Sequence, residues 1–315
     1  MKEKYRILCE KEKSIPLFSQ AWWLDCVCGK DDWDVCLVEK GGVIIASMPY
    51  YITTRYCFSY SVQPKLTQNL GPWIRQSDAK YSKRLGHEKK ILTELFSQLP
   101  KTHHFQQNWD HKFNNWLPIY WLGYVQSTRY TYRLNDLSNL DGIYRETLAN
   151  IKTDIKKAIN KYSLVVTDEL PFSEFLKLNH QTYLRQSIDV PYSDQFVSSL
   201  ISEAKLRNQA KWLIAKDADG RNHAGVLIVW DENSAYYLMG GGDPELRNSG
   251  ATSLCMWEAI KFSATVTKSF DFEGSMLESV ERFFRAFGAE QTPYFSISKT
   301  TSKILKIRNA LKEII

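Results

Sequence analysis

The stretch from Ala235 to Ala286, AYYLMGGGDPELRNSGATSLCMWEAIKFSATVTKSFDFEGSMLESVERFFRA, has the pattern of strand, glycine turn, helix, strand and helix. Residues 235–239 form a short apolar run, and three glycines end it. Ser249 or Thr252 is suited to cap a helix that continues to about Ala264. Backbone N–H groups and the positive end of the helix dipole meet at such a helix start, so the stretch predicts a site for a phosphate-bearing ligand.

Composition sets broad limits on the class of protein. With 315 residues, 43% of them hydrophobic, the chain is long enough for about two domains. The net charge of +6 suits an anionic small substrate, RNA or a membrane surface equally well. The first residues, MKEKYRILCEKEK, are too charged for a signal peptide, and no apolar run reaches the roughly 18 residues that span a bilayer. We therefore expect a cytosolic protein.

The cysteine pattern predicts reduced, buried thiols. Cys26 and Cys28 lack the two-residue gap of a zinc knuckle, and the other cysteines are scattered through apolar or strand-like segments. The six residues are Cys9, Cys26, Cys28, Cys36, Cys57 and Cys255.

Two halves of the chain share one order of elements. After an expected strand at Tyr5–Cys9 and a helix behind Pro16, the first half contains a hairpin around Gly41, and the second half repeats such a hairpin at residues 212–230. Each half ends with a short aromatic helix, a glycine and a strand, in FNNWLPIYWLGYVQSTRYTYRL and ESVERFFRAFGAEQTPYFSIS. We infer an internal duplication with domains at 1–136 and 137–315 and a cleft between the two copies.

The order of elements is similar to the GNAT acyltransferase fold, and the tandem pair resembles the Fem aminoacyltransferases and their acyl-CoA-using relatives in bacterial polysaccharide clusters. The resemblance covers nearly the whole chain. It implies a mixed α/β fold of two GNAT-like domains, each a mostly antiparallel sheet flanked by helices, and it implies an acyltransferase. The phrases that carry it are FSQAWWLDCVCG, ASMPYYI, PKLTQNLGPWI, HHFQQNWD, YLRQSIDVPYS, FDFEGSM and RFFRAFGAEQTPYFSI.

In GNAT enzymes the pyrophosphate of acyl-CoA lies on a loop of the form [QR]xxGx[GA], and this chain has RNSGAT, with Thr252 at the last small position. The resemblance thus implies acetyl-CoA or another acyl-CoA as donor. In an alternative interpretation, Arg247 is an ordinary charged residue on the surface. The implied donor-binding residues are Met239, Gly240, Arg247, Asn248, Ser249, Gly250 and Ala251.

Acyl transfer to an amine needs a base and donors for the developing oxyanion, and the resemblance implies neither a metal nor a covalent nucleophile. Asp271 and Glu273 alternate in KSFDFEG, so a strand there points both carboxylates to one face. One ionised group raises the pKa of the other, and our hypothesis makes one the base and the other a binder of an amine or sugar hydroxyl. In the alternative, one carboxylate caps the next helix and the other pairs with Arg282 or Arg285.

Acceptor candidates follow a predicted helix in YLRQS. Arg185 and Gln186 are suited to hold a phosphate or carboxylate, and Tyr192 to stack on a base or sugar, although a solvated helix end explains Arg185 as well. The histidines do not have the spacing of a helical metal pair. Neither a GxxxxGK loop nor a GxSxG elbow occurs, which argues against nucleotide hydrolysis and α/β-hydrolase chemistry.

Two predicted basic helices indicate which partners the protein is able to bind. The lysines of NIKTDIKKAINKY suit tRNA or other phosphates, or form a solvated face. The segment KILKIRNALKEII has apolar residues at helical spacing that suit an anionic membrane, but we expect them to dock against their own domain. These apolar residues are Ile304, Ile307, Leu311 and Ile315.

The resulting hypothesis is an N-acyltransferase that moves an acetyl or similar group from coenzyme A to an amino group of a nucleotide sugar or other cell-wall or polysaccharide precursor. The first alternative is transfer of an amino acid from aminoacyl-tRNA to a cell-wall precursor. The second is a duplicated fold that binds a partner without turnover. None of the three involves DNA.

Overall fold

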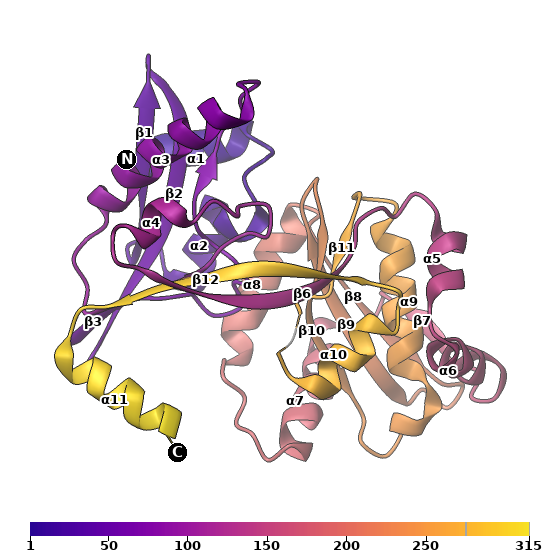
Figure 1. The fold of residues 1–315 in the computed structure, drawn as a ribbon. Coiled ribbons are helices and arrows are strands. Elements are labelled where there is room, and N and C mark those ends of the chain that lie inside the picture. Colours follow the sequence, from indigo (N-terminus) through magenta and orange to yellow (C-terminus); the bar gives the residue numbers. More distant parts are fainter. Residues whose placement is uncertain (275, 315) are drawn as a thin grey trace. The chain divides into compact units, whose positions relative to one another are not determined.

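The computed structural model describes residues 1–274 and 276–314, which form two compact units (Figure 1). Unit 1 comprises Met1–Arg129 and Pro293–Ile315, and unit 2 comprises Tyr130–Thr292. The division expected from the sequence, 1–136 and 137–315, differs mainly at its carboxyl end, because residues 293–315 fold with unit 1.

Unit 1 is built on a mostly antiparallel sheet with the strand order β1-β2-β3-β5-β12. Strands β3 and β5 run parallel, and the short strand β4 pairs with β2. The elements are α1 (Lys2–Lys11), α2 (Ala21–Cys28), β1 (Trp33–Lys40), β2 (Val43–Arg55), β3 (Phe58–Ser61), β4 (Trp73–Ile74), α3 (Tyr81–Gln98), β5 (His104–Asn108), α4 (Leu117–Tyr120), β12 (Glu290–Thr300) and α11 (Lys303–Ile314).

The strand expected at Tyr5–Cys9 is wrong, because this segment lies inside helix α1. Tyr5, Leu8 and Cys9 are three to four residues apart and pack together against the core of unit 1, while charged residues occupy the solvent side. The Tyr5 hydroxyl donates to the Ser19 carbonyl oxygen at 2.7 Å. Helical spacing therefore outweighed the apparent alternation over these few residues.

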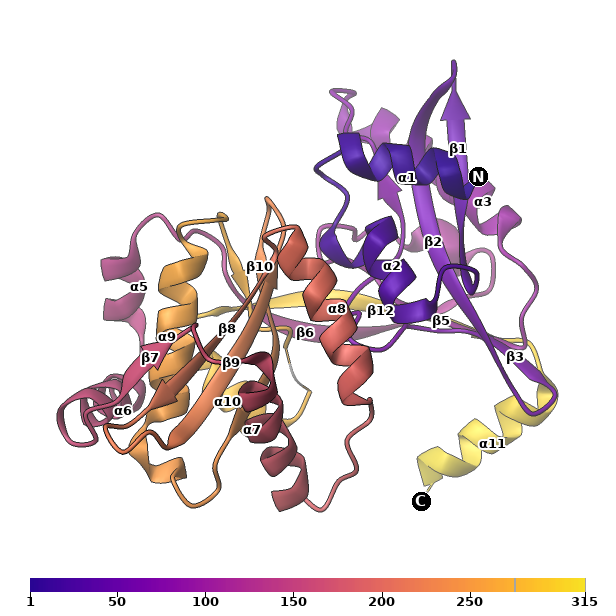
Figure 2. The ribbon, with the colours of Figure 1, turned by 180° about the vertical axis from the view of Figure 1, so that it is seen from behind.

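Unit 2 has the strand order β7-β8-β9-β10-β11-β6, in which β10 and β11 run parallel. Helices α7 and α9 cover opposite faces of this sheet, since alternate residues of β9 meet one or the other (Figure 2). The elements are β6 (Val125–Leu134), α5 (Leu140–Glu146), α6 (Ala149–Asn160), β7 (Val165–Thr167), α7 (Phe172–Arg185), α8 (Asp194–Leu206), β8 (Ala210–Lys216), β9 (Asn222–Trp230), β10 (Ala235–Gly242), the 3-10 turn η2 (Arg247–Ser249), α9 (Ala251–Ser263), β11 (Phe270–Asp271) and α10 (Glu278–Arg285).

The closing strands of the two halves are exchanged. In β6, which ends the first half of the sequence, Arg133 and Leu134 pair with β11 of unit 2. In β12, which ends the second half, residues 296–300 pair with β5 of unit 1. Each unit therefore has the expected mostly antiparallel sheet, closed by an antiparallel strand that comes from the other half of the sequence.

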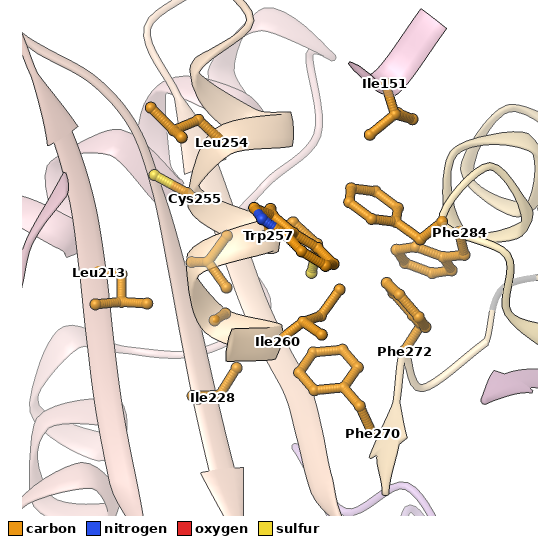
Figure 3. Close-up of a cluster of buried hydrophobic side chains, with 14 of the residues drawn as sticks. Ile151, Leu213, Ile228, Leu254, Cys255, Trp257, Ile260, Phe270, Phe272 and Phe284 are labelled. Carbon is orange, nitrogen blue, oxygen red and sulfur yellow. The ribbon is translucent and has the colours of Figure 1, made fainter. Parts of the chain in front are cut away.

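The core of unit 2 lies between α9 and the strands beneath it (Figure 3). Trp257 and Ile260 of α9 belong to the same buried cluster as Phe270, Phe272 and Phe284. The Phe272 ring lies 4.9 Å from that of Phe270 and 5.2 Å from that of Phe284, measured between centroids. The apolar side chains around β11 thus fix the position of the acidic residues that this strand carries.

All six cysteines are free thiols. Cys36 and Cys255 are buried, which agrees with the expectation, whereas Cys57 is exposed. Burial raises the pKa of the Cys255 thiol to about 12, so this side chain serves as a small apolar residue in the core.

Candidate active site

Strands β10 and β11 separate soon after they begin. Among the described residues they pair only at Ala235 with Phe270 and at Tyr236 with Asp271. Strand β10 then continues along β9 to Gly242, with an irregularity in register between Tyr237 and Met239. Strand β10 thus splays away from β11 beyond Tyr236, which opens one backbone edge of β10 next to the two acidic residues.

Side chains of α7 reach part of this edge. The Asn179 amide donates to the Gly240 carbonyl oxygen at 2.7 Å, and the Gly242 N–H donates to the Thr182 hydroxyl at 3.1 Å. Gly241 touches the α7 backbone, because a Cβ at this position would lie 2.3 Å from the Asn179 nitrogen. Helix α7 therefore covers residues 240–242, and residues 237–239 are left as the segment where backbone donors to a substrate carbonyl are expected.

Asp271 is held by a buried ion pair with Arg133. An Arg133 Nη lies 2.6 Å from an Asp271 carboxylate oxygen, and both side chains are buried. The Thr131 hydroxyl donates to the same carboxylate, and Arg133 also donates to the Ser269 hydroxyl at 3.0 Å. Hydrogen bonds to both of its carboxylate oxygens thereby hold Asp271 in place.

The pairing of Asp271 differs from the alternative that the sequence suggested. Its partner is Arg133 of the exchanged strand β6, whereas Arg285 binds Glu281 at 2.8 Å. The sequence reasoning missed Arg133. The available signal was an arginine inside the alternating run RYTYRL, because a cation on a buried strand face needs a carboxylate.

The alternation of residues predicted that Glu273 lies on the strand. In the structure it lies just beyond the end of the strand. Strand β11 ends at Asp271, and Glu273 has a φ of +51°, a left-handed value that is unusual for a residue with a side chain. The Glu273 N–H donates to an Asp271 carboxylate oxygen at 2.9 Å, and the Gly274 N–H donates to the Thr131 hydroxyl at 2.9 Å. Strained backbone of this kind is concentrated at functional sites.

The Glu273 carboxyl holds its proton unusually tightly. Burial raises its pKa well above the ordinary carboxyl range, and the charge of Asp271 raises it further. The two carboxylates therefore differ in their surroundings: Asp271 is paired with Arg133, which does not fit the predicted role of binding an amine or sugar hydroxyl, and Glu273 remains the candidate for the base.

A tyrosine cluster adjoins β10. The Tyr192 hydroxyl donates to the Asn179 amide oxygen at 3.0 Å and lies 3.3 Å from the Tyr183 hydroxyl. Tyr237 covers Gly240, where a Cβ would lie 1.9 Å from the Tyr237 hydroxyl. Burial raises the pKa of both Tyr192 and Tyr237, so these phenols stay protonated and act as hydrogen-bond donors.

The predicted acceptor residues separate into two places. Tyr192 belongs to the tyrosine cluster, whereas Arg185 and Gln186 are exposed where α7 ends. The structure therefore brings Tyr192, but not the other two, to the edge of β10.

The RNSGAT loop is partly covered by α6. Gly250 has a φ of +82°, and a Cβ there would lie 2.2 Å from the Asp154 carbonyl oxygen of α6. Ser249 and Ala251 are buried, and Met239 is buried in β10. Arg247 and Asn248 are exposed, as is Thr252, so the threonine that departs from the GNAT pattern meets no steric obstacle. Only the exposed residues of this loop, Arg247, Asn248 and Thr252, are therefore accessible to a phosphate group.

Replacement of Gly250 by alanine is expected to destabilise the protein by at least about 2 kcal/mol, because the left-handed φ disfavours a side chain and the Asp154 carbonyl blocks the new methyl group. The matched control is Gly86→Ala, inside helix α3 with open space around it, which should be neutral or stabilise by up to about 1 kcal/mol. Urea unfolding of both variants measures the difference. Equal stabilities would show that α6 does not lie against this loop.

Helix α6 presents lysines beside the loop. Ile151, Ile155 and Ala158 are buried in the core shared with α9, so the intervening lysines lie on the outer side. Lys157 pairs with Asp154 at 2.8 Å, and Lys156 and Lys161 are exposed. The pair of Asp154 and Lys157 lies next to the loop, because Gly250 approaches the Asp154 carbonyl oxygen.

Comparisons with known proteins agree with this architecture. Residues 145–285 match the family described as "Acetyltransferase (GNAT) domain". The curated proteins contain no significant match to the chain. Among solved structures, FemX is similar with a TM-score of 0.66 and 11% identity, covering 94% of this chain and 95% of that one.

Two further structures resemble nearly the whole chain. The C-terminal domain of a protein named as a lysylphosphatidylglycerol synthetase from Agrobacterium fabrum aligns with a TM-score of 0.58 and 10% identity, covering 98% of this chain and 95% of that one. A tandem GNAT protein from the clavulanic acid biosynthesis pathway aligns with a TM-score of 0.50 and 10% identity, covering 86% and 84%. At such identities these likenesses establish the fold, with two GNAT-like units in tandem.

Proposed function

We propose that the chain is an acyltransferase that moves an acyl group from a phosphate-bearing donor to an amino group of a nucleotide sugar or cell-wall precursor, since its residues 145–285 match the GNAT acetyltransferase domain family. One observation carries the proposal. The edge of β10 opens beside Glu273, a carboxyl with a raised pKa, where an acyl carbonyl and an attacking amine can meet.

In the proposed mechanism, Glu273, the backbone of residues 237–239 and Asp271 each have a separate role. Glu273 accepts the proton that the amine loses as its nitrogen attacks the acyl carbonyl carbon. Backbone N–H groups of residues 237–239 stabilise the oxyanion, which collapses to an amide as the bond to the donor breaks. Asp271 is a positioning residue, because it binds the Glu273 N–H and its charge favours the protonated form of Glu273.

The first donor that we propose is acyl-CoA, by analogy with the GNAT domain. Its phosphates would meet the exposed side chains of Arg247 and Asn248 and the lysines of α6. The buried loop residues Ser249 and Ala251 would support this contact from below rather than touch the ligand.

Aminoacyl-tRNA is the second donor, and a specific observation favours it. Helix α6 occludes the backbone of Gly250, which a GNAT pyrophosphate loop would offer to coenzyme A, while the basic face of α6 suits a polyanion. FemX and the synthetase named for lysylphosphatidylglycerol share the fold, and the latter name describes an aminoacyl group on a lipid.

The acceptor is proposed to bind between the tyrosine cluster and the end of α7. Tyr192 and Tyr183 offer hydroxyls and ring faces to a sugar, and Arg185 and Gln186 offer a contact for a phosphate or carboxylate farther out. This arrangement suits an amino sugar or a peptide amine carried on a phosphorylated precursor.

Thermal shift measurements with acetyl-CoA and, separately, with aminoacyl-tRNA distinguish the donors. A ligand at about 100 times its dissociation constant stabilises the native state by roughly 2.7 kcal/mol. We expect Arg247→Ala to reduce the shift given by the true donor, and Arg207→Ala, an exposed arginine that pairs with Glu203, to leave it unchanged. Absence of a shift with acetyl-CoA at millimolar concentration would rule out the first donor.

A further inference from the structure

The last described helix, α11, turns an apolar stripe towards solvent. Ile304, Ile307 and Leu311 are 65%, 63% and 57% exposed and share one side of the helix, whereas Leu305 is buried. The expectation that the stripe docks against its own domain is therefore wrong for these three residues, because α11 is held through Leu305 instead. Ile315, the fourth member of the predicted stripe, lies outside the described residues.

Cations border this stripe. At 100° per residue, Lys303 and Lys306 fall on one side of it and Arg308 on the other, and all three are exposed. The segment KTTSKILKIR at residues 299–308 contains four cations and no acidic residue. An apolar stripe between basic flanks is typical of helices that lie in the plane of an anionic membrane surface.

A second apolar surface lies at α4 and the start of β6, and we name it the Trp121 patch. Besides Leu122, four large side chains are exposed there within nine residues, and the Lys89 ammonium lies 4.6 Å from the Trp121 ring centroid. Tryptophan and tyrosine side chains favour the boundary between lipid headgroups and acyl chains. The patch consists of Leu117, Tyr120, Trp121 and Val125.

One side chain connects the two surfaces. The Lys299 ammonium at the end of β12 donates to the Leu122 carbonyl oxygen at 2.7 Å and lies 4.8 Å from the Tyr124 ring centroid. Helix α11 begins at Lys303, only four residues later (Figure 1). The Trp121 patch and the start of α11 are therefore neighbours within unit 1.

We propose that unit 1 binds the surface of an anionic lipid bilayer through the α11 stripe and the Trp121 patch. The apolar side chains enter the headgroup boundary, and the flanking lysines and arginine meet lipid phosphates. Among the described residues no helix is long and apolar enough to cross a bilayer, so the contact is made from one side. This binding is independent of the acyl-transfer chemistry assigned to unit 2.

Vesicle sedimentation with the full chain tests the proposal. We expect binding to vesicles of phosphatidylcholine with phosphatidylglycerol, weaker binding to phosphatidylcholine alone, and a decrease with added salt. The triple variant Ile304→Ser, Ile307→Ser, Leu311→Ser should lower the partition coefficient at least about tenfold. The matched control, Ile7→Ser with Val43→Ser, removes two exposed apolar side chains elsewhere in unit 1 and should bind like the wild type.

The contribution of the Trp121 patch has its own readout. Lipids brominated near the headgroup should quench part of the tryptophan fluorescence of the bound protein, and Trp121→Phe should remove that part. Failure of the wild type to bind phosphatidylglycerol vesicles would overturn the proposal, as would equal binding by the triple variant. A third result would also overturn it: light scattering shows that the wild type is a dimer and the triple variant a monomer, and neither protein binds vesicles. A second copy of the chain would then cover the stripe.

Discussion

Replacing Glu273 by glutamine is expected to reduce acyl transfer by on the order of 10² to 10⁴, the usual contribution of a positioned general base. The amide has nearly the shape of the carboxyl, so the strained turn at φ +51° and the contact between the Glu273 N–H and Asp271 remain. In the wild type the rate should rise as pH increases through the raised pKa of Glu273, because the active form of Glu273 is ionised. Glu273→Gln should abolish that rise.

The same substitution should act on stability in the opposite direction. Because the folded state holds the Glu273 proton more tightly than the unfolded chain does, its contribution to stability is full below the ordinary carboxyl range and is lost as pH rises through the raised pKa. A glutamine does not ionise. The variant should therefore gain stability relative to the wild type as pH increases, as expected where a site sacrifices stability for function.

Activity and urea unfolding measured across pH test both statements, with Glu278→Gln as control, since Glu278 is an exposed acid five residues farther along the chain. Unchanged turnover in Glu273→Gln, or a wild-type pH profile, would remove Glu273 from the mechanism. A loss of activity accompanied by loss of stability at high pH would show that Glu273 holds the fold.

Breaking the pair between Arg133 and Asp271 is expected to cost about 3–5 kcal/mol, since either single change leaves a buried charge without its partner. Asp271→Asn preserves the acceptor oxygen for Thr131 and Glu273 but removes the charge that Arg133 needs. Arg133→Met should be similarly destabilised.

The double variant Arg133→Met, Asp271→Asn should recover part of this loss, because both buried charges disappear together. The exposed pair of Arg207 and Glu203 is a suitable control, and Arg207→Met should alter the midpoint of urea unfolding only slightly. If Arg133→Met is no more destabilising than Arg207→Met, the ion pair does not hold β11 against β6.

Local patterns in the sequence were enough for most elements and for the resemblance to the tandem GNAT fold. The glycine turn after 235–239, the hairpins and the amphipathic helices depend on neighbouring residues, whose periodicity and turn chemistry are read directly from the chain. The acidic pair at 271 and 273 was recognised in the same way. Where periodicity was short and ambiguous, as at Tyr5–Cys9, the prediction failed.

What the sequence determined by itself is the order of helices and strands, the two related halves and the residue types available for acyl transfer, because these follow from local spacing. Only the tertiary structure decided which closing strand joins which sheet, that α6 covers the loop at Gly250, and that Asp271 meets Arg133, 138 residues away. The two closing segments are similar enough that local pattern cannot select their partners. That selection, and the pKa of Glu273 that depends on it, comes from burial and charge contributed by distant parts of the chain.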